Sequence, residues 1–451
     1  MTSLTKDRTS RSEGESVVDR LLLVLALLAF GFIAFVGGAF VVLQQWAPGQ
    51  FLANAYEGTR ALYYLSLDRQ SPLISNQWFP ARRAETGVTV YDPTRAVDGY
   101  TLFTTTNGSI AQLVNMRGEV VHEWQVAFSD ILDETSSIEN QAPDEFGFLE
   151  KAHLFPNGDL LAVMASVDTP YGYGLVKLDA NSNVVWKYLE RVHHDVEPGA
   201  DGRIYTLTHR INQDNVPDRD HLKGPRIDDY LAVLSPEGQE LQRVSILDAF
   251  LDTEFESILT RTRPGIPGDL LHANAIQPIE GDLVDKMPFP AANTVLISLR
   301  EIDALAAISL DTGKVVWMLR GSWVAQHDPD ILPNGNILLF DNLGGFAPDN
   351  HSRVLEVDPR TGGVVWSYRG TPEHPFDSFI RGSQERLANG NTLITESTGS
   401  RVFEVTPEGD IVWEYLSPVR EASPADPSIM LSPTLSRAKR FAPEDLEFVG
   451  Y

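Results

Sequence analysis

The chain has 451 residues, a formal net charge of −26 at pH 7 and no cysteine. A surface this acidic repels phosphate backbones, so the composition argues against nucleic-acid binding. The absence of cysteine excludes disulfide bonds, thiol catalysis and cysteine-ligated metal centres.

The first predicted element is a single membrane-spanning helix. Residues 21–43 form an uninterrupted run of apolar, Gly and Ala residues, long enough to cross a hydrocarbon core. The basic residues near this run all precede it: Lys6, Arg8, Arg11 and Arg20. The positive-inside rule therefore predicts a cytoplasmic tail at 1–20, an anchor in the lipid bilayer of the inner (cytoplasmic) membrane, and a periplasmic remainder. A signal peptide cleaved near Ala53 is the alternative, but the apolar run is too long for one.

Two further features belong to this N-terminal region. Ala34 and Gly38 form a small-xxx-small pair on one helix face, a weak indication of a homodimer. Residues 44–95 are predicted to connect the anchor to a folded domain.

A repeated pattern occupies residues 96–445. One half of each repeat is a turn feeding an apolar strand, as in "FPNGDLLAVMA" from Phe155 and "LPNGNILLF" from Leu332. The other half is a turn and a β-run ending in tryptophan, at Trp124, Trp186, Trp317, Trp366 and Trp413. We expect each of these rings to pack against the next repeat.

Pairing the halves gives six repeats of about 45 residues. They lie near 96–124, 150–188, 193–245, 270–318, 326–368 and 380–415. Short strands at this period, with Gly/Asn turns between them, predict an all-β fold, a β-propeller. Six blades is the favoured count, and five or seven stay open because two repeats are degenerate.

Histidines recur at one position of the repeat. His194 and His327 each lie eight residues before the glycine of their turn, and His272 has nearly the same offset. The inner strands of a propeller begin around its central channel, so we expect the three imidazoles to meet there. His193 remains an alternative to His194. Asp195 and Asp328 directly follow two of the histidines, and they are predicted to orient or charge the imidazoles.

Two more polar residues fit the same channel. Asn274 lies two residues after His272, on the same side of a strand, and Arg300 ends the apolar strand "NTVLISLR". A guanidinium among three histidines argues against a metal site, because it repels a cation. The set suits an anion: Arg300 and charged imidazoles would neutralise its oxygen atoms while one neutral imidazole attacks it.

These residues resemble the bacterial arylsulfate sulfotransferase family. The resemblance rests on "HHD" at 193–195, "HAN" at 272–274, "SLR" at 298–300, "QHD" at 326–328 and "RAKRF" near the C-terminus. It implies a six-bladed propeller that transfers a sulfuryl group from a phenolic sulfate to a phenol or another hydroxyl acceptor. It also implies a ping-pong cycle through a sulfohistidine, with no nucleotide sulfate donor and no cofactor.

The resemblance assigns roles to individual residues. His327 would be the nucleophile, and His194, His272 and Arg300 would bind the sulfuryl oxygens. One of those two histidines would also exchange a proton with the phenol oxygen. Asn274 would support the same oxygens, and Thr395 or Ser397 would bind substrate from the last repeat.

Two other functions fit parts of the pattern. An anchored propeller could act as a scaffold or assembly factor, without catalysis. A quinone-cofactor dehydrogenase is favoured by "DTGKVVW" at 311–317, which resembles its tryptophan repeats. Six repeats rather than eight, and the lack of a vicinal cysteine pair, argue against the dehydrogenase.

Overall fold

The computed structural model describes residues 10–43, 71–138, 141–167, 172–219, 221–260, 268–344 and 351–449. The chain divides into two compact units, Met1–Arg69 and Gln70–Tyr451. Residues 44–70 of the predicted connector lie outside the described residues, whereas residues 71–95 contribute two strands to the second unit.

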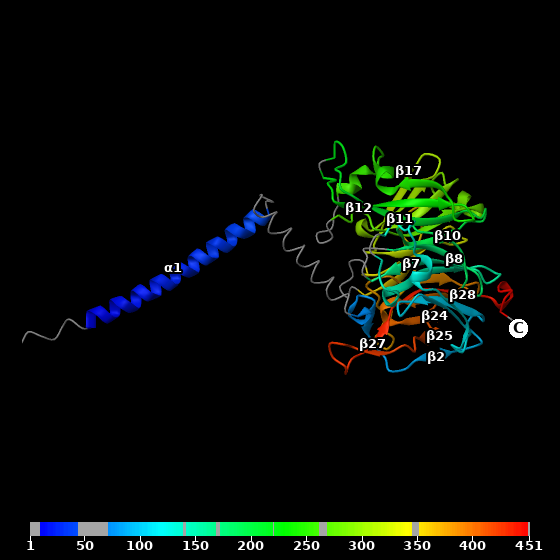
Figure 1. The fold of residues 1–451 in the computed structure, drawn as a ribbon, viewed down its shortest axis with the longest axis horizontal. Helices are drawn as coiled ribbons and strands as arrows, with labels where there is room; N and C mark the ends of the chain where they lie inside the picture. Colours follow the sequence, from blue (N-terminus) through cyan, green and yellow to red (C-terminus); the bar gives the residue numbers. More distant parts are fainter. Residues whose placement is uncertain are drawn as a thin grey trace, which may run out of the picture. The chain divides into compact units, whose positions relative to one another are not determined.

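The first unit contains one long helix, α1 (Ser10–Leu43), drawn in blue in Figure 1. Its segment Asp19–Val41 is long and apolar enough to cross a membrane, and none of it is buried in the protein. The predicted N-terminal apolar helix is therefore confirmed. By length and composition it suits either a membrane anchor or a signal sequence.

The described part of the second unit is built from six antiparallel sheets of four or five strands and one small three-stranded sheet (Figure 1). The first sheet contains β28 (Leu435–Phe441), β3 (Tyr100–Thr105), β4 (Ile110–Val114) and β5 (Val120–Gln125). The second contains β6 (Gly147–Leu154), β7 (Leu160–Ser166), β8 (Gly174–Leu178) and β9 (Val184–Tyr188). The third contains β10 (Val192–Pro198), β11 (Ile204–Asn212), β12 (Arg226–Leu234) and β13 (Glu240–Ser245).

The remaining sheets follow the same order. The fourth contains β14 (Ala273–Ile279), β15 (Thr294–Leu299), β16 (Ala304–Ser309) and β17 (Lys314–Arg320). The fifth contains β18 (His327–Ile331), β19 (Ile337–Asp341), β20 (Arg353–Val357) and β21 (Val364–Tyr368). The sixth contains β22 (Ser383–Arg386), β23 (Thr392–Glu396), β24 (Arg401–Val405), β25 (Ile411–Leu416) and β2 (Gly87–Tyr91). The small sheet contains β1 (Trp78–Pro80), β27 (Met430–Pro433) and β26 (Glu421–Ala422).

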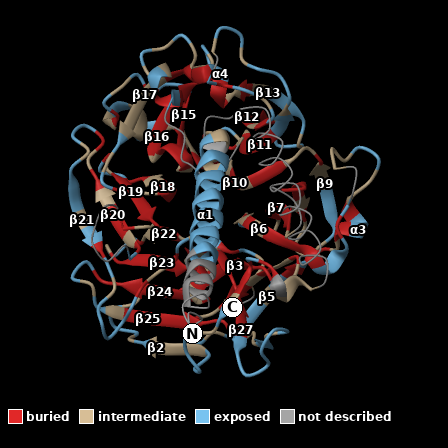
Figure 2. Ribbon diagram, turned by 90° about the vertical axis from the view of Figure 1, so that its left-hand side faces the viewer, coloured by how far each residue is buried: buried red, intermediate tan, exposed pale blue. Residues whose placement is uncertain are grey.

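The sheets are arranged around a common centre (Figure 2). Strands β6, β10, β18 and β22 lie toward the middle, and β9, β13, β17 and β21 lie at the outside. Contacts join each innermost strand to the next, from β6 through β10, β14, β18 and β22 to β28 and back to β6. The predicted all-β, propeller-like architecture is therefore confirmed.

Burial explains why the strand sequences differ within a sheet. Middle strands such as β7, β15 and β23 are buried along their whole length, and β7 and β15 read as continuous apolar or small-residue runs. Outer strands such as β5 and β9 are largely exposed. The apolar clusters lie between neighbouring sheets: one joins β3–β5 to β6–β8, and another joins β11–β13 to β14–β17. The core therefore consists of layers between sheets.

The repeated tryptophans connect one sheet to the next, as predicted. The indole N–H of Trp124 donates to the carbonyl of Gly158 at 3.0 Å, and that of Trp413 donates to Met116 at 3.0 Å. In each case the acceptor lies in a turn of the adjacent sheet. Trp186 and Trp366 make the same type of bond to Pro236 and Pro407.

Two short α-helices follow outer strands, α3 (Phe128–Ile131) after β5 and α4 (Ile246–Phe250) after β13. Both helices pack apolar side chains into the layers between sheets.

Candidate active site

Four of the predicted site residues line one cavity of about 250 Å³. His194 lies on β10, His272 directly precedes β14, His327 begins β18 and Arg300 directly follows β15. These residues are distant in the sequence but come from three consecutive sheets. The structure therefore brings together the three histidines and the arginine.

The backbone is strained where these residues lie. β10 has an irregular register between His193 and Val196, and β18 has one between His327 and Asp330. His194 and His272 adopt left-handed conformations, with φ of 57° and 51°. Such conformations are uncommon for residues other than glycine, and they concentrate at functional sites. Here they turn consecutive side chains out of the alternation of a regular strand.

His194, and not His193, faces the cavity. The rings of His194 and His272 lie 5.0 Å apart between centroids. His193 lies behind them: its Nδ1 is 2.7 Å from Nδ1 of His194, and its Nε2 is 3.5 Å from the carboxylate of Asp229. Only His194 of this pair lines the cavity.

His327 is held in one tautomer. Its Nδ1 lies 2.7 Å from Oδ1 of Asn342 and 3.1 Å from the backbone carbonyl of Ala325. Both neighbours are acceptors, so Nδ1 carries the proton and Nε2 keeps its lone pair. The amide of Asn342 is itself fixed, because its Nδ2 donates to the carbonyls of Ser378 and Arg381.

Burial keeps His327 and His194 neutral. Burial, followed by the positive charge of Arg300, lowers the pKa of His327 to about 3. Burial, followed by the neighbouring His272, also lowers the pKa of His194 well below its usual value. At neutral pH both imidazoles are therefore uncharged while the cavity is empty.

The carboxylates around the histidines differ from the predicted ones. Asp269, which the sequence reading missed, contacts Nδ1 of His272 at 2.6 Å. Asp195 accepts a hydrogen bond from the backbone N–H of Ile276 and pairs with Lys151. Asp328 lies 3.5 Å from Arg437. Asp195 and Asp328 thus contact other partners, and the imidazole partners are Asp269 and Asn342.

Asn274 lines a smaller adjoining cavity of about 50 Å³, together with His194 and His327. Its Nδ2 donates to the carbonyl of Gln326 at 2.8 Å. Its Oδ1 is buried and has no hydrogen-bond partner among the described residues. A buried unsatisfied acceptor is costly, so this atom is a natural contact for a substrate donor group.

Thr395 is buried in the sixth sheet and does not line either cavity. Its hydroxyl accepts from the backbone N–H of Ala438 at 2.9 Å and lies 2.9 Å from the hydroxyl of Ser383. Ser397, the other candidate, accepts from the backbone N–H of Gly382 at 3.0 Å. In the described structure both side chains join strands to one another.

The last sheet instead supplies Arg381, which the sequence reading missed. Arg381 lines both cavities, as does Glu150 of β6. The two side chains contact each other at 3.4 Å, and Glu150 also accepts from the backbone N–H of His194 at 2.9 Å. A signal was present: Glu150 lies eight residues before Gly158, at the offset of His194 and His327 from their own turns.

A cluster of buried charges forms one wall of the smaller cavity. Arg437, from the "RAKRF" segment on β28, lies 3.5 Å from Asp328 and 3.5 Å from Asp330. Lys151 contacts Glu197 at 2.8 Å. Burial and the neighbouring Asp328 raise the pKa of Asp330 to about 8. Two cations and the acidic side chains of Asp195, Glu197, Asp328 and Asp330 thus lie beside the histidines, and β28 supplies one of the cations.

The fold has similarities to several solved structures at low sequence identity. A protein of unknown function from Bacteroides caccae is 12% identical, with a TM-score of 0.46 over 71% of this chain and 94% of that one. A streptogramin B lyase is 12% identical, with a TM-score of 0.40 over 80% and 96% of the two chains. The Dos1 propeller is 13% identical, with a TM-score of 0.38 over 77% of each chain. These values support no conclusion about activity.

No curated protein matches the chain. A family does match: the model described as arylsulfotransferase (ASST) covers residues 151–417. That segment runs from β6 to the end of β25 and contains all three histidines, Arg300 and Arg381. The match spans more than half of the chain and agrees with the motifs at 193–195, 272–274 and 326–328. The chain belongs to the arylsulfotransferase family.

Proposed function

We propose that this protein is a membrane-anchored sulfotransferase that transfers a sulfuryl group from a phenolic sulfate ester to a phenolic or other hydroxyl acceptor. The observation that carries the proposal is the meeting of His194, His272, Arg300 and His327 on one cavity. His327 is neutral there and has its lone pair on Nε2, which is the state that a nucleophile requires.

The cavity suits the sulfate group of a donor. Arg300 and Arg381 would attract its oxygen atoms, and the unsatisfied Oδ1 of Asn274 would accept from a donor group nearby. An anion beside His194 favours the charged form of that imidazole, so binding would raise its low pKa. The imidazole of His194 can therefore be neutral while the cavity is empty and charged once an anion is bound, as expected from the sequence.

In the first half-reaction Nε2 of His327 attacks the sulfur atom. The Nε2–S bond forms, the bond between sulfur and the phenolic oxygen breaks, and the oxygen takes a proton from a histidine acid. We assign that acid to His272, because the carboxylate of Asp269 contacts its Nδ1 at 2.6 Å and orients the ring for proton transfer. The products are a free phenol and a sulfohistidine.

In the second half-reaction the acceptor hydroxyl attacks the same sulfur atom. His272 takes the proton from that hydroxyl, the new O–S bond forms, and the Nε2–S bond breaks. His327 then returns to its neutral state, and no other reactant is consumed. Because one cavity serves donor and acceptor in turn, the cycle is ping-pong and needs no nucleotide sulfate.

Sulfuryl transfer resembles phosphoryl transfer, for which positioning and charge stabilisation supply most of the catalysis. The cations Arg300 and Arg381 would stabilise the charge that spreads over the sulfuryl oxygens. The buried partners Glu301 and Glu150 hold these guanidinium groups in place before the substrate arrives.

The proposal includes the architecture and the location. The six sheets would be the blades of a closed propeller, in which β28 completes the blade that begins at β3. Residues 21–43 would anchor the protein in the inner membrane, with the propeller in the periplasm. The apolar segment Asp19–Val41 and the basic residues before it support this topology.

The test uses the full chain in detergent with 4-nitrophenyl sulfate and a phenol acceptor. We expect release of 4-nitrophenol with a matching amount of sulfated acceptor. His327→Ala should abolish release, and Arg300→Ala should slow it about 10²- to 10³-fold, as for a lost oxyanion donor. Intact-mass measurement without acceptor should detect one added sulfuryl group on the wild type and none on His327→Ala.

His221→Ala is the matched control, because His221 is exposed and lies outside both cavities. It should keep wild-type turnover. Unchanged turnover in His327→Ala would refute the assignment of the nucleophile. Hydrolysis of the donor without any sulfated acceptor would refute the transfer reaction.

A further inference from the structure

A second and larger cavity lies apart from the histidines. Its volume is about 430 Å³, within the usual range of small-molecule pockets. Its walls come from residues 81–90, 373–375, 396–401, 414–420 and Ser432. Neither the proposed reaction nor the sequence motifs give this cavity a role.

The cavity has an unusual charge distribution for so acidic a protein. It is lined by Arg82, Arg83, Arg401 and Arg420, against the carboxylates of Glu373, Glu396 and Glu414. Arg401 contacts Glu396 at 3.0 Å and Glu414 at 2.6 Å. Arg82 also pairs with Glu396, and Arg83 with Glu414.

Arg420 differs from the other three arginines. Its guanidinium donates to the carbonyls of Ser417 at 2.7 Å and Val419 at 2.8 Å, and to the hydroxyl of Ser432 at 2.8 Å. Every hydrogen bond that it makes within the described structure goes to a neutral oxygen. Burial lowers the pKa of Arg420, and no carboxylate offsets that effect. A ligand with a negative group would compensate this charge.

The rest of the lining consists of apolar residues and Gly399, together with the polar His374 and Ser432. Ala81, Val90, Pro375 and Leu416 contribute aliphatic surface beside the guanidinium groups. Such a cavity suits a small organic anion: a carboxylate, sulfonate or sulfate group at Arg420 and an apolar body against the aliphatic side chains.

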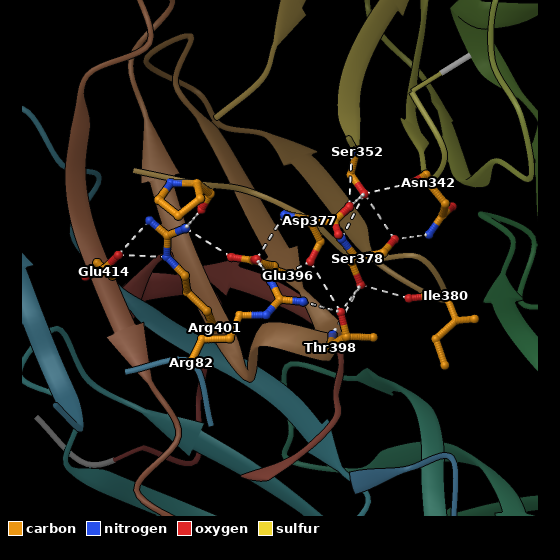
Figure 3. Close-up of polar contacts among 11 residues, drawn as sticks. Arg82, Asn342, Ser352, Asp377, Ser378, Ile380, Glu396, Thr398, Arg401 and Glu414 are labelled. Atoms are coloured by element: carbon orange, nitrogen blue, oxygen red, sulfur yellow. Dashed lines mark hydrogen bonds and ion pairs between the residues drawn. The ribbon is translucent and has the colours of Figure 1, made fainter. Parts of the chain in front are cut away.

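One lining residue, Arg82, holds the start of segment 377–381 (Figure 3). That segment in turn contacts Asn342, the partner of His327. Besides its pairing with Glu396, Arg82 donates to the carbonyl of Asp377 at 2.7 Å and to the hydroxyl of Thr398 at 3.0 Å. The backbone N–H of Asp377 donates to the same Glu396 at 3.0 Å. The start of the segment 377–381 is therefore fixed by groups of this cavity.

The next residue of the segment, Ser378, is bonded to Asn342, the partner of His327. The backbone N–H of Ser378 donates to the hydroxyl of Ser352 at 2.8 Å, and that hydroxyl donates to the carbonyl of Asn342 at 2.7 Å. Nδ2 of Asn342 donates back to the carbonyl of Ser378 at 2.7 Å (Figure 3). Oδ1 of Asn342 then holds Nδ1 of His327. The contacts form a continuous path from Arg82 to the imidazole.

We propose that this second cavity is a binding site for a small organic anion and that its occupancy changes the orientation of His327. An anion at Arg420 would compete with Glu396 for Arg82, whose side chain is 40% exposed. Segment 377–381 would then lose the Arg82 bonds to Asp377 and Thr398. Asn342 would shift with it, and the sulfuryl-transfer rate would change. The binding site stands without the proposed function, whereas the rate effect rests on it.

The experiment uses naphthalene-2-sulfonate, whose C–S bond cannot donate a sulfuryl group. Calorimetric titration of the full chain in detergent should show binding that Arg420→Gln weakens at least 10-fold. Arg117→Gln removes the same charge from an exposed site outside the cavity and should bind the probe as the wild type does. Arg300→Ala should also keep this binding, because Arg300 lines only the histidine cavity. Equal affinity of Arg420→Gln and the wild type would overturn the site.

The coupling is tested by phenol release with and without the probe. A saturating probe should change kcat at least twofold in the wild type. Ser352→Ala removes the hydroxyl that joins Ser378 to Asn342. This variant should still bind the probe, but the bound probe should not change its kcat. A bound probe that leaves wild-type kcat unchanged would overturn the coupling, and so would an equal response in Ser352→Ala. If the protein released no phenol, the proposed function would fail while the calorimetric result still tested the site.

Discussion

Nδ1 of His327 is held by a side-chain amide, whereas that of His272 is held by a carboxylate. The amide oxygen fixes the tautomer, and its favourable effect on the charged ring is outweighed by burial and by Arg300, so His327 stays neutral. A carboxylate stabilises an imidazolium more strongly and suits a group that gives and takes a proton. In the proposed reaction, two chemically identical side chains would thus take different roles because of one neighbour each.

This difference leads to a prediction for Asn342. Asn342→Leu removes the nearer of the two acceptors at Nδ1 and leaves only the Ala325 carbonyl, so His327 can more easily turn and place its proton on Nε2. We expect kcat to fall about 10- to 100-fold, by analogy with the partners that orient metal-binding imidazoles. KM for 4-nitrophenyl sulfate should change little, because Asn342 does not line either cavity. Steady-state kinetics of phenol release give both values.

Asn342→Asp tests whether the lower kcat of Asn342→Leu comes from the lost orientation of His327 or from a general structural effect. The carboxylate keeps an acceptor at Nδ1 and raises the pKa of His327 from its low value, since it favours the charged ring. Activity should therefore exceed that of Asn342→Leu and should fall off at a higher pH on the acid side than in the wild type. Identical pH profiles in Asn342→Asp and the wild type would contradict the role given to Asn342.

Among individual residues, the sequence predicted those that precede a turn by a nearly constant number of residues. His194, His272 and His327 were found because each precedes its turn by a nearly constant number of residues. Asn342 follows the end of β19, and Asp269 lies in the loop before β14, so neither shares that offset. Their contacts depend on side-chain directions across neighbouring strands, which one sequence does not encode in a readable way.

Four strands at or next to the outer edge of their sheets do more than complete those sheets. Each of β5, β9, β21 and β25 carries a tryptophan whose indole N–H bonds to a turn of the next sheet. Antiparallel sheets packed face to face have few directional contacts between them, because most of their hydrogen bonds run within each sheet. The indoles supply such contacts and fix one sheet against the next.

The burial of each tryptophan ring predicts how much it contributes to the free energy of unfolding. Trp413 is fully buried, donates to Met116 and lies 4.8 Å from the guanidinium of Arg440. Trp413→Phe leaves the Met116 carbonyl without that donor and opens a cavity, so we expect a loss of about 2–4 kcal/mol of unfolding free energy. Urea denaturation followed by circular dichroism measures the change.

Trp186→Phe is the matched control, because Trp186 makes the same type of bond but is only partly buried. The loss of unfolding free energy in Trp186→Phe should be about 1 kcal/mol or less, since water can satisfy the exposed carbonyl. Equal destabilisation by the two variants would show that burial does not set the contribution of these rings.

Element positions were predictable because the repeat combines two independent signals, the Asn-Gly turn and the terminal tryptophan. Gly158 and Gly335 have φ of 90° and 88° in equivalent turns, a conformation that glycine adopts at no steric cost. The strands β1, β26 and β27 carry neither signal. β27 (430–433) pairs with β1 (78–80) on one side and with β26 (421–422) on the other. Local sequence does not specify a partner as distant as β1.

On the scale of the whole molecule, the first sheet is assembled from both ends of the second unit. β28 pairs with β3, so that Leu435 lies opposite Thr105 and Phe441 lies opposite Tyr100. β28 also brings Arg437 to the charge cluster beside the histidines and Arg440 to the buried Glu404. The closing strand therefore supplies backbone pairing and two buried cations.

Deletion of residues 434–451 should consequently disrupt more than one sheet. The buried carboxylates of Glu404 and Glu197 would lose a cation, and β3 would become an exposed edge. We expect the truncated chain to lose cooperative thermal unfolding and to aggregate, as measured by differential scanning fluorimetry and light scattering.

A peptide of residues 430–449 added in trans should restore cooperative unfolding, because it supplies the missing strand and both arginines. The same peptide with Arg437→Ala and Arg440→Ala should restore less. A truncated chain that melted at the wild-type temperature would contradict the role assigned to β28.

The pairing of β28 with β3 also sets a condition on biosynthesis. Arg440 bonds to the carbonyl of Val97, 343 residues earlier in the chain. A ribosome delivers β3 long before β28, so the nascent chain carries an unpaired strand edge during most of its synthesis. Contacts of such large sequence separation form slowly, and open edges invite pairing with other chains. The edge of β3 therefore stays open to pairing with other chains until residues 435–441 have been synthesised.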